Sequence, residues 1–206
     1  MRLFAATALI VFAALASADD HGAKVDLYEQ GAELAKACIA CHTASGAGTG
    51  PAFPNLGGQG FRYLHEQLKW IQSGDRSIPE MTGQLDKLSD QDLKALAKYF
   101  SDQPMATGST DPELLDQGRR IYMGGSHERG IPACTACHSP TGSGTPAAAY
   151  PALSGQSSQY VAKALRNYRF KRRIGGENQI MATISARLTE QEIDAVASYV
   201  SGLRKR

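Results

Sequence analysis

The 206-residue sequence lacks the features of a membrane-embedded or a nucleic-acid-binding protein. After residue 18 no apolar run approaches the roughly 20 residues that a bilayer-spanning helix needs, so we expect a soluble mature chain. No strongly basic segment is interleaved with stacking aromatic residues, which argues against nucleic acid as a partner. Cysteine is also scarce, with only four residues in the chain. Their positions are therefore informative.

All four cysteines fall in two copies of the pattern Cys-x-x-Cys-His, at residues 38–42 and 134–138. This pattern is typical of covalent haem c attachment, in which two thiols form thioethers and the histidine ligates the iron. The alternatives are a redox dithiol, which needs no histidine there, and half of a zinc site. We predict two covalent haem c groups. The attachment residues would be Cys38, Cys41, Cys134 and Cys137, and the iron ligands on one side His42 and His138.

The first 18 residues have the pattern of a secretory signal peptide. Arg2 is followed by an almost wholly apolar run over 3–15, and Ala16-Ser17-Ala18 fits the small-residue cleavage pattern. An uncleaved membrane anchor is the alternative, but the run is short and two aspartates follow it. We therefore predict export to the periplasm with removal of residues 1–18. Haem c attachment on the outer side of the bacterial inner membrane agrees with export.

An internal repeat organises the rest of the chain. His42 and His138 are 96 residues apart, and the other matched pairs are 97 or 100 apart: Pro54/Pro151, Gln59/Gln156, Tyr63/Tyr160, Leu68/Leu165 and Arg76/Arg173, then Met81/Met181, Leu88/Leu188 and Tyr99/Tyr199. A small drift with conserved order indicates a tandem duplication with loop insertions. We predict one domain over 19–100, a linker rich in Asp, Pro, Thr, Gly and Ser over 101–112, and a second domain over 113–206.

Each copy has the periodicity of helices, and no alternating run is long enough for a sheet. We expect helices over 27–37 and 61–72 in the first copy, and over 112–123 and 157–170 in the second. The last helices begin after the N-cap residues Ser89 and Thr189, where Thr189 with Glu192 forms a capping box and Ser89 with Asp92 a weaker one. The predicted fold class is all-α, in units so small that a covalent porphyrin would supply the apolar centre.

Met81 and Met181 are the predicted iron ligands on the side opposite the histidines. Both lie eight residues before the N-cap of their last helix, whereas Met105 lies in the linker and Met123 precedes the second haem motif. A thioether ligand raises the reduction potential and closes the iron to substrates. The alternative is that both methionines fill the core.

Two further pairs of repeated residues are candidates for contacts that hold the haem ligands and the haem propionates. The carbonyls of Pro54 and Pro151 could accept a hydrogen bond from the ligating imidazoles, unless these are ordinary loop prolines. Arg76 and Arg173 could pair with haem propionates or be solvated surface charges.

The charges are unevenly distributed along the chain. Residues 19–105 carry 8 basic and 12 acidic side chains, whereas residues 106–206 carry 13 and 8. Opposite charges on two proteins speed their encounter and make it salt-sensitive. The basic cluster over 166–173 is a candidate docking patch, with a solvated helix face as the alternative.

Taken together, these motifs resemble class I cytochrome c, twice. The shared pieces are Gly31, residues 38–42, residues 54–56, Met81 and Tyr99, repeated as Gly118, residues 134–138, residues 151–153, Met181 and Tyr199. Residues 57–59 and 154–156 follow the proline segments, and with them the tandem resembles the dihaem cytochrome c4 family. The resemblance implies two tandem class I cytochrome c domains, each wrapped around one covalent haem and related by a pseudo-twofold axis.

The same resemblance implies electron transfer in the periplasm. Its partners would be redox proteins: a cytochrome bc-type donor and a haem–copper terminal oxidase or other acceptor, with peripheral membrane association through them. One alternative is the cytochrome subunit of a flavocytochrome sulfide dehydrogenase. Another is a dihaem redox enzyme, but a peroxidase needs an open iron site, and no cysteine is spare to act as an iron ligand. We therefore predict an electron carrier rather than an enzyme.

Overall fold

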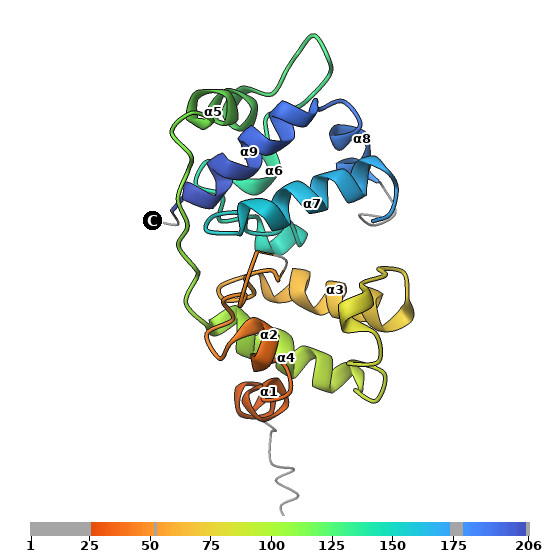
Figure 1. Cartoon of the computed structure of the whole chain (residues 1–206). Helices are drawn as coiled ribbons and strands as arrows, with labels where there is room; N and C mark the ends of the chain where they lie inside the picture. The colour runs from red at the N-terminus through yellow and green to blue at the C-terminus, as the bar shows by residue number, and fades with distance from the viewer. Residues whose placement is uncertain (1–25, 52, 174–178, 205–206) are drawn as a thin grey trace, which may run out of the picture.

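The fold is that of a computed structural model, which describes residues 26–51, 53–173 and 179–204. The predicted signal peptide lies outside these residues. Within the described ranges the regular structure is helical, apart from two isolated β-bridges, and no helix there is long and apolar enough to cross a membrane. The helices form two units, stacked one above the other in Figure 1. The all-α prediction is confirmed.

The two units share four helices in the same order, and the second unit has one additional 3-10 turn. The first unit consists of α1 (Leu27–Ala35), α2 (Ile39–His42), α3 (Phe61–Ser73), the 3-10 turn η1 (Pro79–Met81) and α4 (Asp90–Asp102). The second consists of α5 (Leu115–Gly124), α6 (Thr135–His138), the 3-10 turn η2 (Pro146–Ala148), α7 (Ser158–Arg169), α8 (Ile180–Ser185) and α9 (Glu190–Gly202). In Figure 1, α3 and α7 are the long helices nearest to the boundary between the units.

Both predicted capping boxes form. The Oγ of Ser89 accepts from the N–H of Asp92, and the Oγ1 of Thr189 accepts from the N–H of Glu192, at 3.2 Å in each case. Glu192 also pairs with Arg129 from the loop after α5, and this hydrogen bond lowers the pKa of Glu192 to about 2. The second box is therefore tied to a distant loop, and the first is tied to α1, where the Nε2 of Gln30 donates to Asp92 at 2.7 Å.

The first and last helices of each unit cross at a glycine. A Cβ at Gly31 of α1 would overlap the carbonyl oxygen of Ala95 in α4, and a Cβ at Gly118 of α5 would overlap that of Ala195 in α9. The backbones of the paired helices therefore lie in close approach. This contact orients the last helix of each unit so that another apolar face points to the interior. Leu96 of α4 and Val196 of α9 are buried there.

The structure differs from the sequence predictions mainly in short elements and helix ends. The first predicted helix ends at Ala35, and turn residues lead into the first haem motif. Its counterpart begins only at Leu115, after a turn that follows Pro112. Neither η1 nor α8 was expected, because elements of three and six residues are too short to show a helical period. Met81 ends the 3-10 turn η1, and Met181 lies in α8.

The segment between α4 and α5 packs along both units. Met105 lies against Gly58 of the first unit, and Ala106, Gly108 and Asp111 lie against Gly155, Ser201 and Ser198 of the second. In Figure 1 it runs as an extended trace beside both units. The connection is held by contacts over most of its length.

Candidate functional site

A cavity of about 570 Å³ extends through both units and is lined by both Cys-x-x-Cys-His motifs. Its walls are largely apolar, with Leu64, Leu96 and Phe100 in the first unit and Leu165, Val196 and Val200 in the second. Met81 and Met181 also line it. All eight residues predicted to attach a haem or ligate iron therefore face one cavity.

The thiols lie on the short helices α2 and α6 or directly before them. Cys38, Cys134 and Cys137 are half-buried, and Cys41 is exposed. Burial raises the pKa of Cys38 and raises that of Cys134 to about 11. The chain leaves each motif through a residue with positive φ, Thr43 or Ser139, so that the histidine ends its helix.

The histidines are oriented by the predicted prolines. The Nδ1 of His42 lies 3.2 Å from the carbonyl oxygen of Pro54, and the Nδ1 of His138 lies 2.9 Å from that of Pro151. A carbonyl oxygen can only accept, so each Nδ1 carries the proton and each Nε2 presents a lone pair. Burial lowers the pKa of both histidines, against the opposing effect of these hydrogen bonds. The expected role of the proline carbonyls as acceptors is confirmed.

This donor set fits a c-type haem. Each unit offers two thiols, a neutral imidazole held by its Nδ1–H, a thioether and apolar walls. The other two methionines among the described residues do not line the cavity. Met105 accepts a hydrogen bond from the Oγ of Ser154, and Met123 is 45% exposed.

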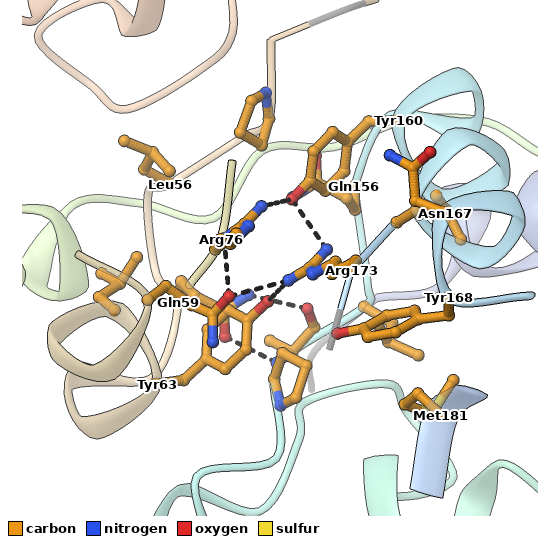
Figure 2. A pocket seen from close by; sticks show the side chains of 18 of the residues that line it. Leu56, Gln59, Tyr63, Arg76, Gln156, Tyr160, Asn167, Tyr168, Arg173 and Met181 are labelled. Carbon is orange, nitrogen blue, oxygen red and sulfur yellow. Dashed lines mark hydrogen bonds between the residues drawn. The ribbon is translucent and has the colours of Figure 1, made fainter. Parts of the chain in front are cut away.

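Two arginines are buried where the units meet. Arg76 and Arg173 are only 8% and 7% exposed, so the alternative of solvated surface charges is wrong. Arg76 donates to the hydroxyl of Tyr160 at 2.9 Å, and Arg173 donates to that of Tyr63 at 2.7 Å. Both also donate to the Oε1 of Gln67, at 2.7 and 3.0 Å. Figure 2 shows the hydroxyl of Tyr160 between the two guanidinium groups. Each arginine thus reaches across to the other unit.

The surroundings of this pair favour a negative charge. Within the described ranges, the hydrogen-bond partners of both guanidinium groups are neutral side chains. Burial disfavours ionisation of Tyr160, but the charges of Arg173 and Arg76 outweigh it and lower the pKa of Tyr160 to about 8. Two desolvated cations bordering a cavity attract an anionic group of a bound molecule. The carboxylates of a haem are such groups.

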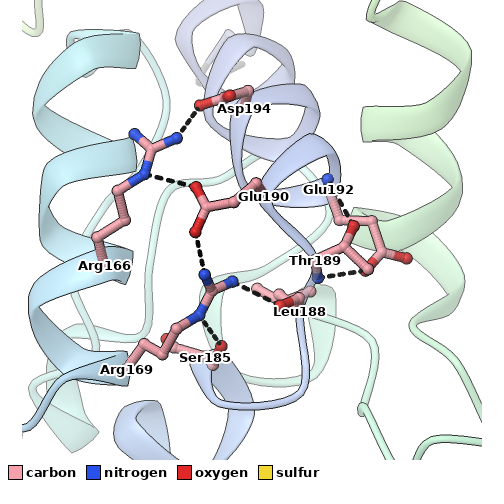
Figure 3. A network of polar contacts seen from close by, with 8 residues as sticks. All are labelled: Arg166, Arg169, Ser185, Leu188, Thr189, Glu190, Glu192 and Asp194. Atoms are coloured by element: carbon pink, nitrogen blue, oxygen red, sulfur yellow. Dashed lines mark hydrogen bonds and ion pairs between the residues drawn. The ribbon is translucent and has the colours of Figure 1, made fainter.

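The candidate docking patch is largely neutralised by its neighbours. Arg166 of α7 pairs with Glu190 at 2.8 Å and Asp194 at 2.6 Å, and Arg169 pairs with Glu190 (Figure 3). Arg173 is buried, which leaves Lys171 and Arg172 as the exposed cations of the predicted cluster. These contacts favour the alternative, a solvated and ion-paired helix face.

Two helical units that each present a haem-attachment motif to an apolar cavity define a c-type cytochrome with two haem domains. Residues 27–100 match the family model "Cytochrome C oxidase, cbb3-type, subunit III", and residues 115–204 match "Cytochrome c". The chain belongs to the cytochrome c4 family. It is 47% identical over 179 residues to cytochrome c4 of Azotobacter vinelandii, an alignment that covers 82% of this chain and 85% of that protein.

A solved structure agrees. The fold matches the crystal structure of reduced recombinant cytochrome c4 from Pseudomonas stutzeri with a TM-score of 0.84 and 42% identity, covering 86% of this chain and 98% of that one. A more distant relative, the thiosulfate dehydrogenase electron acceptor of Thiomonas intermedia, is 35% identical over 81% of this chain and 78% of its own length. The protein is therefore a dihaem electron-transfer cytochrome that carries two covalent haem c groups.

Proposed function

We propose that the protein carries single electrons in the periplasm, from a respiratory donor such as a cytochrome bc-type complex to a haem–copper oxidase or similar acceptor. In this proposal Cys38, Cys41, Cys134 and Cys137 attach the haems, and His42, Met81, His138 and Met181 ligate the irons. One observation carries the assignment: all eight side chains line one apolar cavity. Residues 1–18 would be removed as a signal peptide, leaving domains 19–100 and 113–206 joined by the linker 101–112.

Haem iron supplies a reversible one-electron couple, and histidine–methionine ligation places its potential high. The chain's own residues hold and insulate that couple. Pro54 and Pro151 hold the imidazoles through Nδ1–H, and the apolar walls exclude water. Arg76 and Arg173 would hold propionate groups at the boundary between the units, where the cavity is continuous.

A carrier fits the site better than an enzyme does. Each unit has a methionine lining the cavity in addition to its histidine, so each iron has two candidate ligands. All four thiols belong to attachment motifs, which leaves none for catalysis.

A second candidate function is to accept electrons from a thiosulfate-oxidising enzyme, supported by the Thiomonas intermedia relative. The two functions differ in the donor. Rapid reduction by a thiosulfate dehydrogenase, with slow reduction by a bc-type complex, would favour the second.

The haem assignment is tested by mass and by extraction. The mature protein should exceed its apo mass by two haems, and acid–acetone should leave the colour with the polypeptide. Extraction of haem into the solvent, or a mass increase of one haem, would contradict covalent attachment at both motifs.

The methionine assignment is tested by substitution. Met81→Ala or Met181→Ala should each remove about half of the sulfur-to-iron charge-transfer absorption of the ferric protein and lower one reduction potential. Met105→Ala is the matched control and should change neither. If Met81→Ala left the absorption and both potentials intact, another group would be the ligand.

A further inference from the structure

Two buried glutamines each form hydrogen bonds to the backbone of the opposite unit. The Oε1 of Gln156 accepts from the N–H of Asn55, and its Nε2 donates to the carbonyl of Asn55, both at 2.8 Å. The Oε1 of Gln59 accepts from the N–H of Ala152 at 2.7 Å, and its Nε2 donates to the carbonyl of Ala152 at 2.9 Å. Both glutamines are 7% exposed. The arrangement is reciprocal, as a pseudo-twofold axis requires.

These contacts are made to the peptide groups that orient the histidines. The N–H of Asn55 belongs to the same planar peptide as the carbonyl of Pro54, which accepts from the Nδ1 of His42. A continuous path therefore runs from His42 through this peptide to the Oε1 of Gln156, in the other unit.

The second unit repeats the path with the roles of the units exchanged. The Nδ1 of His138 meets the carbonyl of Pro151, and the N–H of the same peptide, contributed by Ala152, meets the Oε1 of Gln59. Each glutamine thus ends a hydrogen-bond chain that begins at the histidine of the opposite unit.

A second hydrogen bond, from the backbone of its own unit, holds each glutamine oxygen in place. The Oε1 of Gln59 also accepts from the N–H of Gly60 at 2.9 Å, and that of Gln156 accepts from the N–H of Ser157 at 3.0 Å. Gly60 and Ser157 are the N-cap residues of α3 and α7. The acceptors are therefore held in place by the start of the long helix of their own unit.

Hydrogen bonds in a chain polarise one another, most strongly where the surroundings are buried. A peptide whose N–H is bonded to a fixed acceptor has a more negative carbonyl oxygen, which binds an imidazole Nδ1–H more strongly. A stronger bond at Nδ1 makes the imidazole a more basic ligand. A more basic ligand favours the oxidised iron and lowers the reduction potential.

We propose that Gln59 and Gln156 are crossed positioning residues, each setting the basicity of the histidine that ligates the haem of the other unit. The inference rests on the proposed function, because it takes His42 and His138 to be iron ligands. The inference makes a distinctive prediction. A substitution of Gln156 in the second unit changes the potential of the first-unit haem, and a substitution of Gln59 in the first unit changes that of the second-unit haem.

The experiment uses the full holoprotein, with the haems assigned by NMR contacts to protons of each unit. Gln156→Met should raise the reduction potential of the first-unit haem and leave that of the second-unit haem unchanged. Gln59→Met should raise the potential of the second-unit haem and leave that of the first unchanged. The Nδ1–H resonance of His42 should move upfield in Gln156→Met, while that of His138 stays. Gln156→Glu keeps an acceptor oxygen and should hold the first potential at or below its wild-type value.

Arg62→Ala is the matched control. It removes another hydrogen bond between the units, from Arg62 to the carbonyl of Ala147 at 2.6 Å, that touches neither peptide. It should leave both potentials and both resonances unchanged. If Gln156→Met does not fold, Gln156→Asn breaks the same contact with a shorter polar side chain.

The inference fails if the glutamine variants shift the haem of their own unit, shift both haems equally, or shift neither. None of these three results would contradict the assignment of His42 and His138 as iron ligands. If the wild-type protein itself lacked two histidine-ligated haems, the proposed function would fail instead.

Discussion

At the scale of single residues, the buried arginine pair departs furthest from what its sequence suggests. Charged side chains this deeply buried are unusual unless they are paired. Arg76 and Arg173 are satisfied by tyrosine hydroxyls and by Gln67, which keeps both charges beside the cavity. A positive charge there favours the reduced state of a nearby haem.

We therefore predict that Arg173→Gln lowers at least one reduction potential. It should also reduce the free energy of unfolding by about 2 kcal/mol, since hydrogen bonds to Tyr63 and Gln67 are lost. The neighbouring exposed Arg172→Gln is the control and should leave both quantities nearly unchanged. Potentiometric titration and chemical denaturation measure the two effects. Equal responses of the two variants would show that burial of Arg173 is irrelevant.

The sequence predicts individual residues well only where the chemistry is contiguous. Each cysteine–histidine motif occupies five successive positions, so the pattern alone indicates haem attachment. The bonds from Arg76 to Tyr160 and from Arg173 to Tyr63 join residues 84 and 110 positions apart. The repeat pairs these residues, but no local pattern shows that each reaches the opposite unit.

At the scale of helices, the crossing of the first and last helix of each unit depends on one glycine. We predict that Gly118→Ala costs about 1–3 kcal/mol of folding free energy, because the added methyl meets the backbone of α9. Gly124 ends the same helix with open space around it, so Gly124→Ala should cost far less. Denaturation midpoints would compare the two. A tolerated Gly118→Ala would mean that α5 and α9 can separate without penalty.

The start of α9 gives a prediction about pH. The bond from Arg129 lowers the pKa of Glu192 to about 2, below its ordinary value of 4.5, so the folded state favours the charged carboxylate. This contribution is fully present above about pH 4.5 and is lost as the pH falls through 2. Glu192→Gln should lower stability at neutral pH by about 1 kcal/mol and flatten its acid dependence. Urea denaturation between pH 2 and pH 6 measures this.

Glu113→Gln, an exposed carboxyl before α5, is the control for the acid experiment and should retain the wild-type slope. A Glu192→Gln slope identical to wild type would contradict the assigned role of the pair.

Helix starts were predictable where a cap fixes them. Each of the boxes at Ser89 and Thr189 joins residues three positions apart, so four consecutive residues contain the signal. The turn that ends at Met81 and the short helix with Met181 were not predictable as elements, since their conformation depends on packing around the cavity.

At the scale of the whole molecule, the boundary between the units is polar and reciprocal. Asn55, Gln59, Tyr63 and Arg76 of the first unit all bond to the second. The sequence predicted two domains from the repeat, but not how they bind each other. Such an interface couples their stabilities, because separating the units would break these hydrogen bonds.

We predict that the two units unfold in one transition. The single tryptophan, Trp70, lies in the first unit, so its emission on unfolding should follow the same curve as the far-UV dichroism of the whole chain. Tyr63→Phe, which removes a bond to Arg173, should lower the free energy of unfolding by about 1 kcal/mol and shift the midpoints of both curves together. A shift seen only by Trp70 would show that the units unfold independently.

The packed segment between α4 and α5 bears on how quickly an electron passes through the molecule. Because Met105, Ala106 and Asp111 anchor it to the two units, the haems need no diffusive search for one another. Transfer inside the molecule should then be independent of solvent viscosity. Exchange with a partner requires collision and should slow as sucrose is added. Flash-photolysis rates measured at several viscosities would separate the two steps, and an internal rate that falls with viscosity would reveal a hinge in this connection.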